Sequence, residues 1–384
     1  MDFIESDELV MLREAVGSIA SKYGHDYFLA KARAGEKTTE LWDELSAGGY
    51  IGVNLPESHG GGGMGLSALA VVGEELAAAG CPLLMLVVSP AIAGSVIARF
   101  GTPEQQDRWL RGIAAGSMRF AFAITEPAAG SNSHRLSTTA RRDGDGYRLS
   151  GTKHFISGVD EADAILVVAR TSVEDETRRG RLSLMVVPTD APGLTSSLLP
   201  VEIVAPEKQF TLYFDDVWVP EADLLGPEGE GLRLLFYGLN PERVMGAALA
   251  NGIARFALDR AAEYARDRTV WDVPIGAHQG LAHPLAKAKI ELELARLATT
   301  RAAWLYDQGL DAGEAANMAK YAAAESSVGA VDQAVQVHGG LGLASERGVG
   351  TLLGMARLNR IAPVSREMVL NFVAQHSLGL PRSY

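Results

Sequence analysis

The chain has 384 residues, with 47 acidic against 35 basic side chains and a formal net charge of −12. That length is enough for two or three domains with substantial cores. The negative charge argues against a nucleic-acid partner or an anionic membrane surface, because their phosphates would be repelled. The single cysteine, Cys81, excludes an intrachain disulfide and a cysteine-rich metal site.

Two segments bear on the location of the protein. Residues 1–8 are acidic, whereas a secretion signal begins with positive charge. Residues 76–98 carry no charge and could span a bilayer by count alone, but Pro82 and Pro90 interrupt them. We therefore expect core helices separated by a proline break, no transmembrane span and a cytoplasmic protein.

Residues 1–118 have a helical pattern. Asp7–Val16 repeats apolar positions three and four apart. Thr102-Pro103 is a favourable helix start, with threonine as the N-cap and proline in the first helical position. These features predict an N-terminal helical domain over 1–118.

The pattern changes near Phe120. Segments rich in β-branched and aromatic residues predict strands at Tyr147–Ile156, Ala164–Arg170, Ser183–Val187 and Phe210–Phe214. Turn-forming residues separate these segments and no long helical segment intervenes, which favours a mostly antiparallel sheet or barrel over 119–227.

Residues 228–384 return to a helical pattern. Long helices are expected at Arg243–Arg266 and Pro284–Gln308, with Gly309 ending the second. The succession of helices, strands and helices predicts an α+β fold of three domains.

Three familiar motifs give little support to other functions. Gly60–Gly65 satisfies G-x-G-x-x-G but follows turn-forming residues instead of a strand, which predicts a flexible surface turn. His278 and His283 are five residues apart, off a common helical face, so no metal site is expected. The absence of G-x-S-x-G from the sequence leaves a serine hydrolase without support.

Two segments could bind a heteroaromatic ring or a phosphate. Ala121–Asn132 runs from a strand into a turn with Thr125 and Ser131, and Lys153–Gly158 ends a strand with an aromatic ring and a hydroxyl. Hydroxyls and free backbone N–H groups at strand ends can hold such groups. Considered singly, the first is better interpreted as a helix-to-sheet connection and the second as an edge strand entering a turn.

Together the two segments resemble the paired flavin-binding strands of the acyl-CoA dehydrogenase family, T-E-P-x-A-G-S and [WF]-I-[TS]. Further matches follow in the family's order at Phe214–Pro220, Gly226–Gly231, Tyr264–Arg268, His278-Gln279 and Gln336–Gly342. The resemblance covers about residues 5–384. It implies the same three domains with a C-terminal four-helix bundle, FAD as cofactor, an acyl-CoA substrate, and a homotetramer built as a dimer of dimers, or else a dimer.

The resemblance also implies site residues. Phe122, Ile124 and Thr125 would line the flavin, with Phe155 packed on its ring and Ser157 near N5. The other expected cofactor-binding residues are Ser131, Arg268, Trp271, Gln279, Gln336, Val337, Gly339, Gly340, Ser365 and Glu367. Of these, Arg268, Gln279 and the loop from Gln336 to Gly340 would reach the FAD of a neighbouring subunit. The expected substrate-binding residues are Ser131, Tyr237, Asn240 and Arg243.

The catalytic base departs from the commoner family pattern. Relatives usually carry it in a C-terminal Tyr-Glu-Gly-Thr-type segment, where this chain has Pro363, which cannot accept a proton. A branch resembling isovaleryl-CoA and long-chain dehydrogenases carries it in Leu-Glu-Arg, matched here by Pro241-Glu242-Arg243. Alone, Asn240-Pro241 would be interpreted as a helix start. The missing glutamate favours Glu242 as the base over the second candidate, Glu367.

These features predict FAD-dependent α,β-dehydrogenation of an acyl-CoA to the trans-2-enoyl-CoA, as in fatty-acid β-oxidation. Glu242 would remove the α-proton, and electrons would pass through the flavin to an electron-transferring flavoprotein. The alternatives are a flavin oxidase or monooxygenase on the same fold, or a subunit of a heteromeric acyl-CoA dehydrogenase. Leu84–Ile97 and residues near Tyr237 and Leu239 are expected to line the acyl pocket. Whether the Glu242 carboxylate is favoured by a helix N-terminus or disfavoured by burial stays open.

Overall fold

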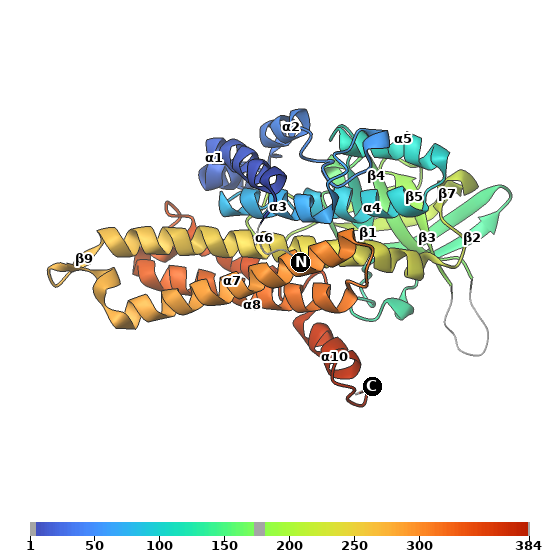
Figure 1. Cartoon of the computed structure of the whole chain (residues 1–384). Helices are drawn as coiled ribbons and strands as arrows, with labels where there is room; N and C mark the ends of the chain where they lie inside the picture. The colour runs from blue at the N-terminus through green and yellow to red at the C-terminus, as the bar shows by residue number, and fades with distance from the viewer. Residues whose placement is uncertain (1–4, 173–180, 383–384) are drawn as a thin grey trace.

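The computed structural model describes residues 5–172 and 181–382 of the chain; residues 1–4 of the acidic N-terminal segment lie outside them. A β-sheet occupies one end of the molecule, and three long C-terminal helices extend from it to the other end (Figure 1). The N-terminal helices lie along one side of both. The predicted divisions at 118/119 and 227/228 stay a prediction.

The N-terminal part is helical, as predicted. Its helices are α1 (Asp7–Ala34), α2 (Thr39–Ala47), α3 (Gly65–Ala78), α4 (Ser95–Phe100) and α5 (Pro103–Ala114). The predicted start of α5 is confirmed: the Thr102 hydroxyl accepts from the Gln105 backbone N–H, and the Gln105 side chain completes a capping box.

The uncharged stretch differs from the prediction at one of its two prolines. α3 ends before Pro82, but Pro90 lies inside a π-helical segment, η2 (Val87–Gly94), that continues directly into α4. A π-helical turn spaces its backbone hydrogen bonds differently, which lets a residue without an N–H stay within the helix. No helix within 5–172 or 181–382 is long and apolar enough to cross a membrane.

The predicted turn at Gly60–Gly65 lies at the surface, as expected, but its backbone is tied to residues 52–55. The backbone N–H groups of Gly62 and Gly63 donate to Gly52 and Leu55. A Cβ atom on Gly61 would lie 2.3 Å from the Leu55 carbonyl oxygen. The glycines therefore allow two stretches of backbone to touch, which is a structural role.

The middle part is a mostly antiparallel sheet, as predicted. Its strands are β1 (Phe120–Ala123), β2 (Thr139–Asp143), β3 (Gly146–Ser157), β4 (Ala164–Arg170), β5 (Leu182–Pro188), β6 (Leu194–Leu199), β7 (Gln209–Pro220) and β8 (Leu224–Leu225). The order is β6-β7-β3-β2-β4-β5-β8, and β1 pairs with β4 in parallel, as β2 does through one residue pair. The sequence missed β2 and β6, whose residues are mostly exposed.

The C-terminal part is built on three long helices. They are α6 (Gly231–Asp267), α7 (Gln279–Asp307) and α8 (Gly313–His338), followed by α9 (Leu352–Leu358) and α10 (Arg366–His376). Gly309 follows the end of α7 at φ 67°, as its predicted role requires. The predicted starts of α6 and α7 are wrong, because both helices begin earlier and contain Pro241 and Pro284 in their interior.

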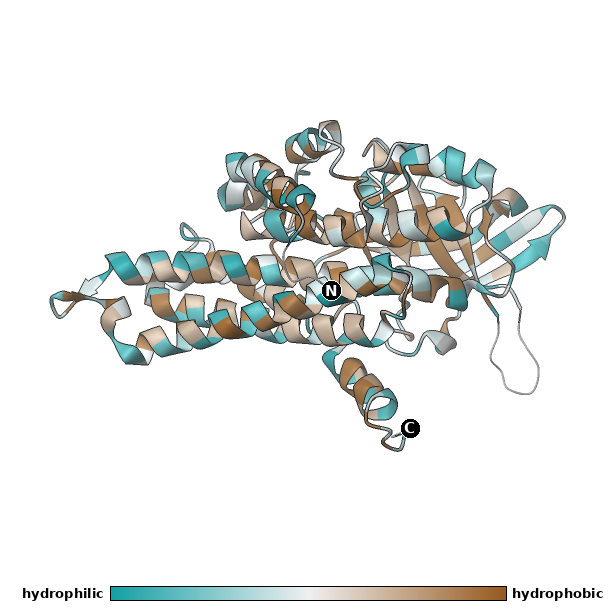
Figure 2. Cartoon of the chain, viewed as in Figure 1, coloured by the Kyte–Doolittle hydropathy of each residue, from teal (hydrophilic) through white to brown (hydrophobic). Residues whose placement is uncertain are grey.

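A buried ionic cluster fixes the N-terminal helices to the long helices. Glu74 and Glu75 of α3 are each 7% exposed and pair with Arg13 of α1, Arg255 of α6 and Arg296 of α7. Apolar residues fill the interior between the N-terminal helices, the sheet and the long helices, most densely in the central strands (Figure 2). Because buried charges demand complete pairing, the cluster defines how these helices sit on one another.

Candidate functional site

Glu242 is an available carboxylate on α6. It is partly buried, and no hydrogen bond or ion pair holds its carboxylate within the described ranges. Burial raises the pKa of Glu242 to about 7, although the positive charges of Arg243 and Lys320 oppose the rise. A carboxyl group with a pKa near the operating pH can take up and release a proton, which a general base must do.

The helix-start interpretation of Asn240-Pro241 is wrong. α6 begins at Gly231, so Glu242 lies in the interior of the helix and gains nothing from a helix N-terminus. The preceding turns are fixed by packing: Leu234 and Leu235 are buried, and a Cβ on Gly238 would lie 2.6 Å from Val96. Burial of these residues overrides the local signal of the proline.

The loop at residues 360–366 approaches the same part of α6. Pro363, the position at which relatives usually carry the base, follows a cis peptide bond. Its Cδ lies 3.5 Å from the position of a Cβ on Gly246, one turn beyond Glu242. The structure therefore brings the usual and the alternative base positions close together, as a shared catalytic site requires.

Arg243 and Asn240 are linked beside Glu242. The Arg243 guanidinium donates to the Leu239 carbonyl and to Asn240 Oδ1, both at 3.2 Å. Arg243 is 8% exposed, and its Nε is buried without a hydrogen-bond partner. One turn earlier, the Tyr237 ring packs against Phe100 and Tyr306, with centroids 5.5 and 5.1 Å apart.

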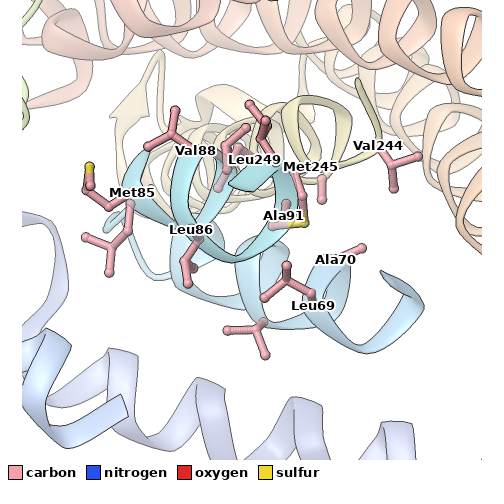
Figure 3. Close-up of a cluster of buried hydrophobic side chains, with 14 of the residues drawn as sticks. Leu69, Ala70, Met85, Leu86, Val88, Ala91, Val244, Met245 and Leu249 are labelled. Atoms are coloured by element: carbon pink, nitrogen blue, oxygen red, sulfur yellow. The ribbon is translucent and has the colours of Figure 1, made fainter. Parts of the chain in front are cut away.

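An apolar cluster adjoins this turn of α6. Figure 3 shows a cluster of buried side chains from α3, from the segment around η2 and from α6: Leu69, Ala70, Met85, Leu86, Val88, Ala91, Val244, Met245 and Leu249. The cluster extends toward the end of β3, because the Met85 sulfur lies 2.3 Å from the position of a Cβ on Gly158. It gives this part of α6 dry, apolar surroundings.

The two predicted binding segments lie side by side at the ends of β1 and β3. The His154 backbone N–H donates to the Thr125 carbonyl at 2.8 Å, and the Ser157 hydroxyl donates to Gln209. Phe155 has φ 57° where the register of β3 against β7 shifts, and its ring is 55% exposed. Positive φ is costly for an aromatic residue and is typical of functional sites.

Sequence reasoning missed the ion pair that joins these segments. Lys153 of β3 is fully buried and donates to Glu126 and to the carbonyl of Ile124, while Phe122 is buried on β1. Burial alone would raise the pKa of Glu126, but Lys153 and the donors of residues 137–138 lower it to about 2. One feature of the sequence could have indicated this pair: a lysine inside a predicted strand, directly before the residues that resemble a flavin-binding strand.

We expect the substitution Lys153→Met to destabilise the protein by about 3–5 kcal/mol, because the buried Glu126 carboxylate would lose its counter-charge. Urea unfolding followed by circular dichroism measures this difference. Lys208→Met is the matched control, since Lys208 is 34% exposed, lies 3.6 Å from Asp160, and should cost about 1 kcal/mol or less. Equal effects of the two substitutions would contradict the structural role of the buried pair.

A second group of predicted site residues lies at the opposite end of the molecule. Arg268 follows α6 and Trp271 is 85% exposed, near the β9 (Thr269–Val270) and β10 (Val273–Pro274) hairpin (Figure 1). Gln279 is the first residue of α7. The end of α8 and the residues directly after it carry the exposed Gln336, Gly339 and Gly340 and the buried Val337. Twenty-six residues separate Glu242 from Arg268, roughly 39 Å along a helix. One chain therefore does not bring the two groups together.

The surroundings of Arg268 suit an anionic ligand. A cavity of about 310 Å³ lies beside Arg268. It is also lined by Arg260, Glu263, Tyr264, Asp267, His338, Arg347 and Val349. A Cβ on Gly339 or Gly340 would meet no atom within 4 Å, so a ligand could approach the backbone there. Guanidinium groups and accessible backbone N–H groups are the usual partners of phosphates.

The remaining predicted residues have local roles in the structure. Ser365 caps α10 by accepting from the Met368 backbone N–H. Glu367 is exposed, and its own backbone N–H and Arg366 lower its pKa, which makes it a weak base. Ser131 is exposed in the loop after β1. Across the described part of the chain, no three His, Cys, Asp or Glu side chains could together hold a metal ion.

Three family models together match most of the chain. They are acyl-CoA dehydrogenase, N-terminal domain, over residues 6–117; middle domain, over 121–217; and C-terminal domain, over 229–378.

Individual proteins match along the whole length. Acyl-CoA dehydrogenase FadE12 of Mycobacterium tuberculosis is 60% identical over 384 residues, covering 100% of this chain and 99% of that protein. The glutaryl-coenzyme A dehydrogenase complex with glutaryl-CoA has a TM-score of 0.93 at 29% identity, covering 100% and 98% of the two chains. The FAD complex of PigA has a TM-score of 0.92 at 27% identity, covering 99% and 100%.

Proposed function

The chain belongs to the acyl-CoA dehydrogenase family, and from that premise we propose that it oxidises the Cα–Cβ bond of an acyl-CoA thioester. The observation that carries this proposal is the Glu242 carboxyl, whose pKa is raised to about 7, on the part of α6 that contributes to an apolar cluster and, one turn further at Gly246, meets Pro363. Glu242 would remove the α-proton. The adjoining apolar side chains would exclude water and receive the acyl chain.

FAD is the cofactor, and the residues at the strand ends fit it. The exposed Phe155 ring offers a face for a flat heterocycle, and Thr125 and Ser157 offer hydroxyls beside it. When bound, FAD supplies a hydride acceptor for the β-position. Ser131 would contact both cofactor and CoA, while Tyr237, Asn240 and Arg243 would contact substrate.

The assembled enzyme would be a homotetramer, a dimer of dimers. The predicted cofactor-binding residues at the far end of α6 lie too far from Phe155 and Glu242 to bind the same FAD. They are Arg268, Trp271, Gln279 and the loop after α8, and they would bind the FAD of a neighbouring subunit. Apolar residues also recur along α7 (Figure 2), where Ile290, Leu294 and Leu297 are each more than half exposed at helical spacing. A second copy of the chain would cover them.

The electron acceptor would be an electron-transferring flavoprotein, in a cytoplasmic enzyme of fatty-acid β-oxidation. The base on α6 favours branched or long acyl chains, as in the branch of the family with the same placement. The complete set of Thr125, Phe155, Ser157 and Glu242 favours an enzyme over a non-catalytic subunit.

Anaerobic titration of the purified protein with a panel of acyl-CoAs tests this function. We expect bleaching of the flavin absorbance by branched or long saturated acyl-CoAs and no bleaching by the matching free acids. The reduced enzyme should react slowly with O₂ and rapidly with an electron-transferring flavoprotein. Rapid oxidation by O₂, with no bleaching by any thioester, would favour the oxidase or monooxygenase alternative.

A further inference from the structure

Lys320 is a buried cation on α8 that contacts the loop of Pro363. Its side chain is 2% exposed, and its ammonium donates to the backbone carbonyl of Val364. A buried ammonium costs several kcal/mol unless other groups compensate it, so its position calls for a reason. The charged groups that act on it are Glu242 and Arg243 of α6, Glu367 of α10 and Glu325 of α8 itself.

The loop that Lys320 contacts has other attachments to α8. Arg360 donates to Glu325 at 2.7 Å, and the Arg366 guanidinium lies 3.7 Å from the same carboxylate. The Arg366 backbone N–H also closes the loop onto the Arg360 carbonyl. Both ends of the loop are thus held without Lys320, whose ammonium reaches the middle at Val364, next to Pro363.

The charge of Lys320 bears directly on Glu242. Burial raises the pKa of Glu242, and the positive charge of Lys320 opposes this rise. Arg243, which lies next to Glu242 on α6, opposes it too. Burial lowers the pKa of Lys320 to about 8, so the ammonium is still largely protonated at pH 7. A nearby positive charge increases the fraction of Glu242 that is ionised, but it also lowers the affinity of the carboxylate for a proton. A pKa near the operating pH balances these two effects.

We propose that Lys320 is a positioning residue that holds the loop of Pro363 against α6 and whose charge, across the contact between α8 and α6, favours the carboxylate form of Glu242. The proposal rests on the role of Glu242 as the base. Lys320 itself would transfer no proton to or from the substrate. Its charge would be balanced while Glu242 is a carboxylate and unbalanced once Glu242 has taken the α-proton.

The test uses the holoenzyme with Lys320→Gln and Lys320→Met. Glutamine keeps a donor for the Val364 carbonyl but removes the charge, and methionine removes both. We expect the pH midpoint of anaerobic flavin reduction to rise by about one unit in both variants, a roughly tenfold loss of rate at pH 6. Infrared difference spectra against Glu242→Gln should show the protonated carboxyl of Glu242 persisting to the same higher pH. Lys320→Arg should restore the midpoint.

Glu325→Gln is the matched control. It removes the attachments of Arg360 and Arg366 but leaves the ammonium in place, so the midpoint should shift much less than in Lys320→Gln, although Glu325 also acts on the charge of Lys320. A rate that falls equally at all pH values in Lys320→Gln, with an unchanged infrared titration, would overturn the proposal and leave Lys320 a purely structural residue. Normal flavin reduction in Glu242→Gln would instead overturn the proposed base, whatever the Lys320 variants do.

Discussion

The substitution Glu242→Gln is expected to abolish substrate-dependent bleaching of the flavin while leaving FAD bound. Loss of a positioned general base costs typically about 10²–10⁴-fold in rate, and glutamine preserves the size and polarity of the side chain. Stopped-flow mixing with a reactive acyl-CoA under anaerobic conditions measures the rate of reduction directly. The visible spectrum of the resting enzyme reports whether FAD is retained.

Glu367→Gln provides the control for this result. Glu367 is the other carboxylate near the position where relatives carry the base, but it is exposed and paired with Arg366. We expect its substitution to leave the bleaching rate within a few-fold of the original. Persistence of bleaching in Glu242→Gln, together with its loss in Glu367→Gln, would move the base to α10.

The pH dependence of reduction follows from the same carboxyl. Because burial raises the pKa of Glu242 to about 7, only part of the free enzyme carries the carboxylate at neutral pH. The rate of flavin reduction at low substrate should therefore rise with pH through about 7 and level off above it. The residual rate of Glu242→Gln should lack this rise.

Arg268→Ala is expected to release FAD and loosen the oligomer together. Arg268 lies roughly 39 Å along the helix from Glu242, so its guanidinium would bind the pyrophosphate of a FAD held mainly by another subunit. Removing that contact takes away a bond between subunits as well as a bond to the cofactor. Flavin absorbance per chain and light scattering at matched concentration measure the two losses.

Arg266→Ala tests whether position, and not charge alone, matters. Arg266 is also exposed, and it lies in the last turn of the same helix, within a different hollow of the surface. Its substitution should leave both the FAD content and the oligomer unchanged. Full FAD content in Arg268→Ala would show that the group at the far end of α6 does not serve the cofactor.

Local patterns in the sequence predicted most of the helices and strands, because the conformational preferences and hydrophobic spacing of neighbouring residues decide most of these elements. Alternating and β-branched segments gave β3, β4 and β5 to within one residue at each end, and Thr102 fixed the start of α5. The errors occurred where packing overrides local preference. Pro90, Pro241 and Pro284 each suggested a break or a start, yet each lies within a helix. Pro90 and Pro241 have buried neighbours in the core, whereas the neighbours of Pro284 are half-buried or exposed.

The family, the order of the three parts and the prediction of Glu242 as the base came from the amino-acid sequence, because motifs in series and the proline at 363 are visible without coordinates. The environment of that carboxyl, in contrast, depends on how distant segments pack in three dimensions. The pKa of Glu242 depends on burial and on Lys320, which lies 78 residues away in the sequence on another helix. Likewise, Lys153 and Glu126 become a pair only when β3 passes the end of β1. Electrostatic effects depend on distance and solvent exposure in three dimensions, which a one-dimensional pattern does not contain.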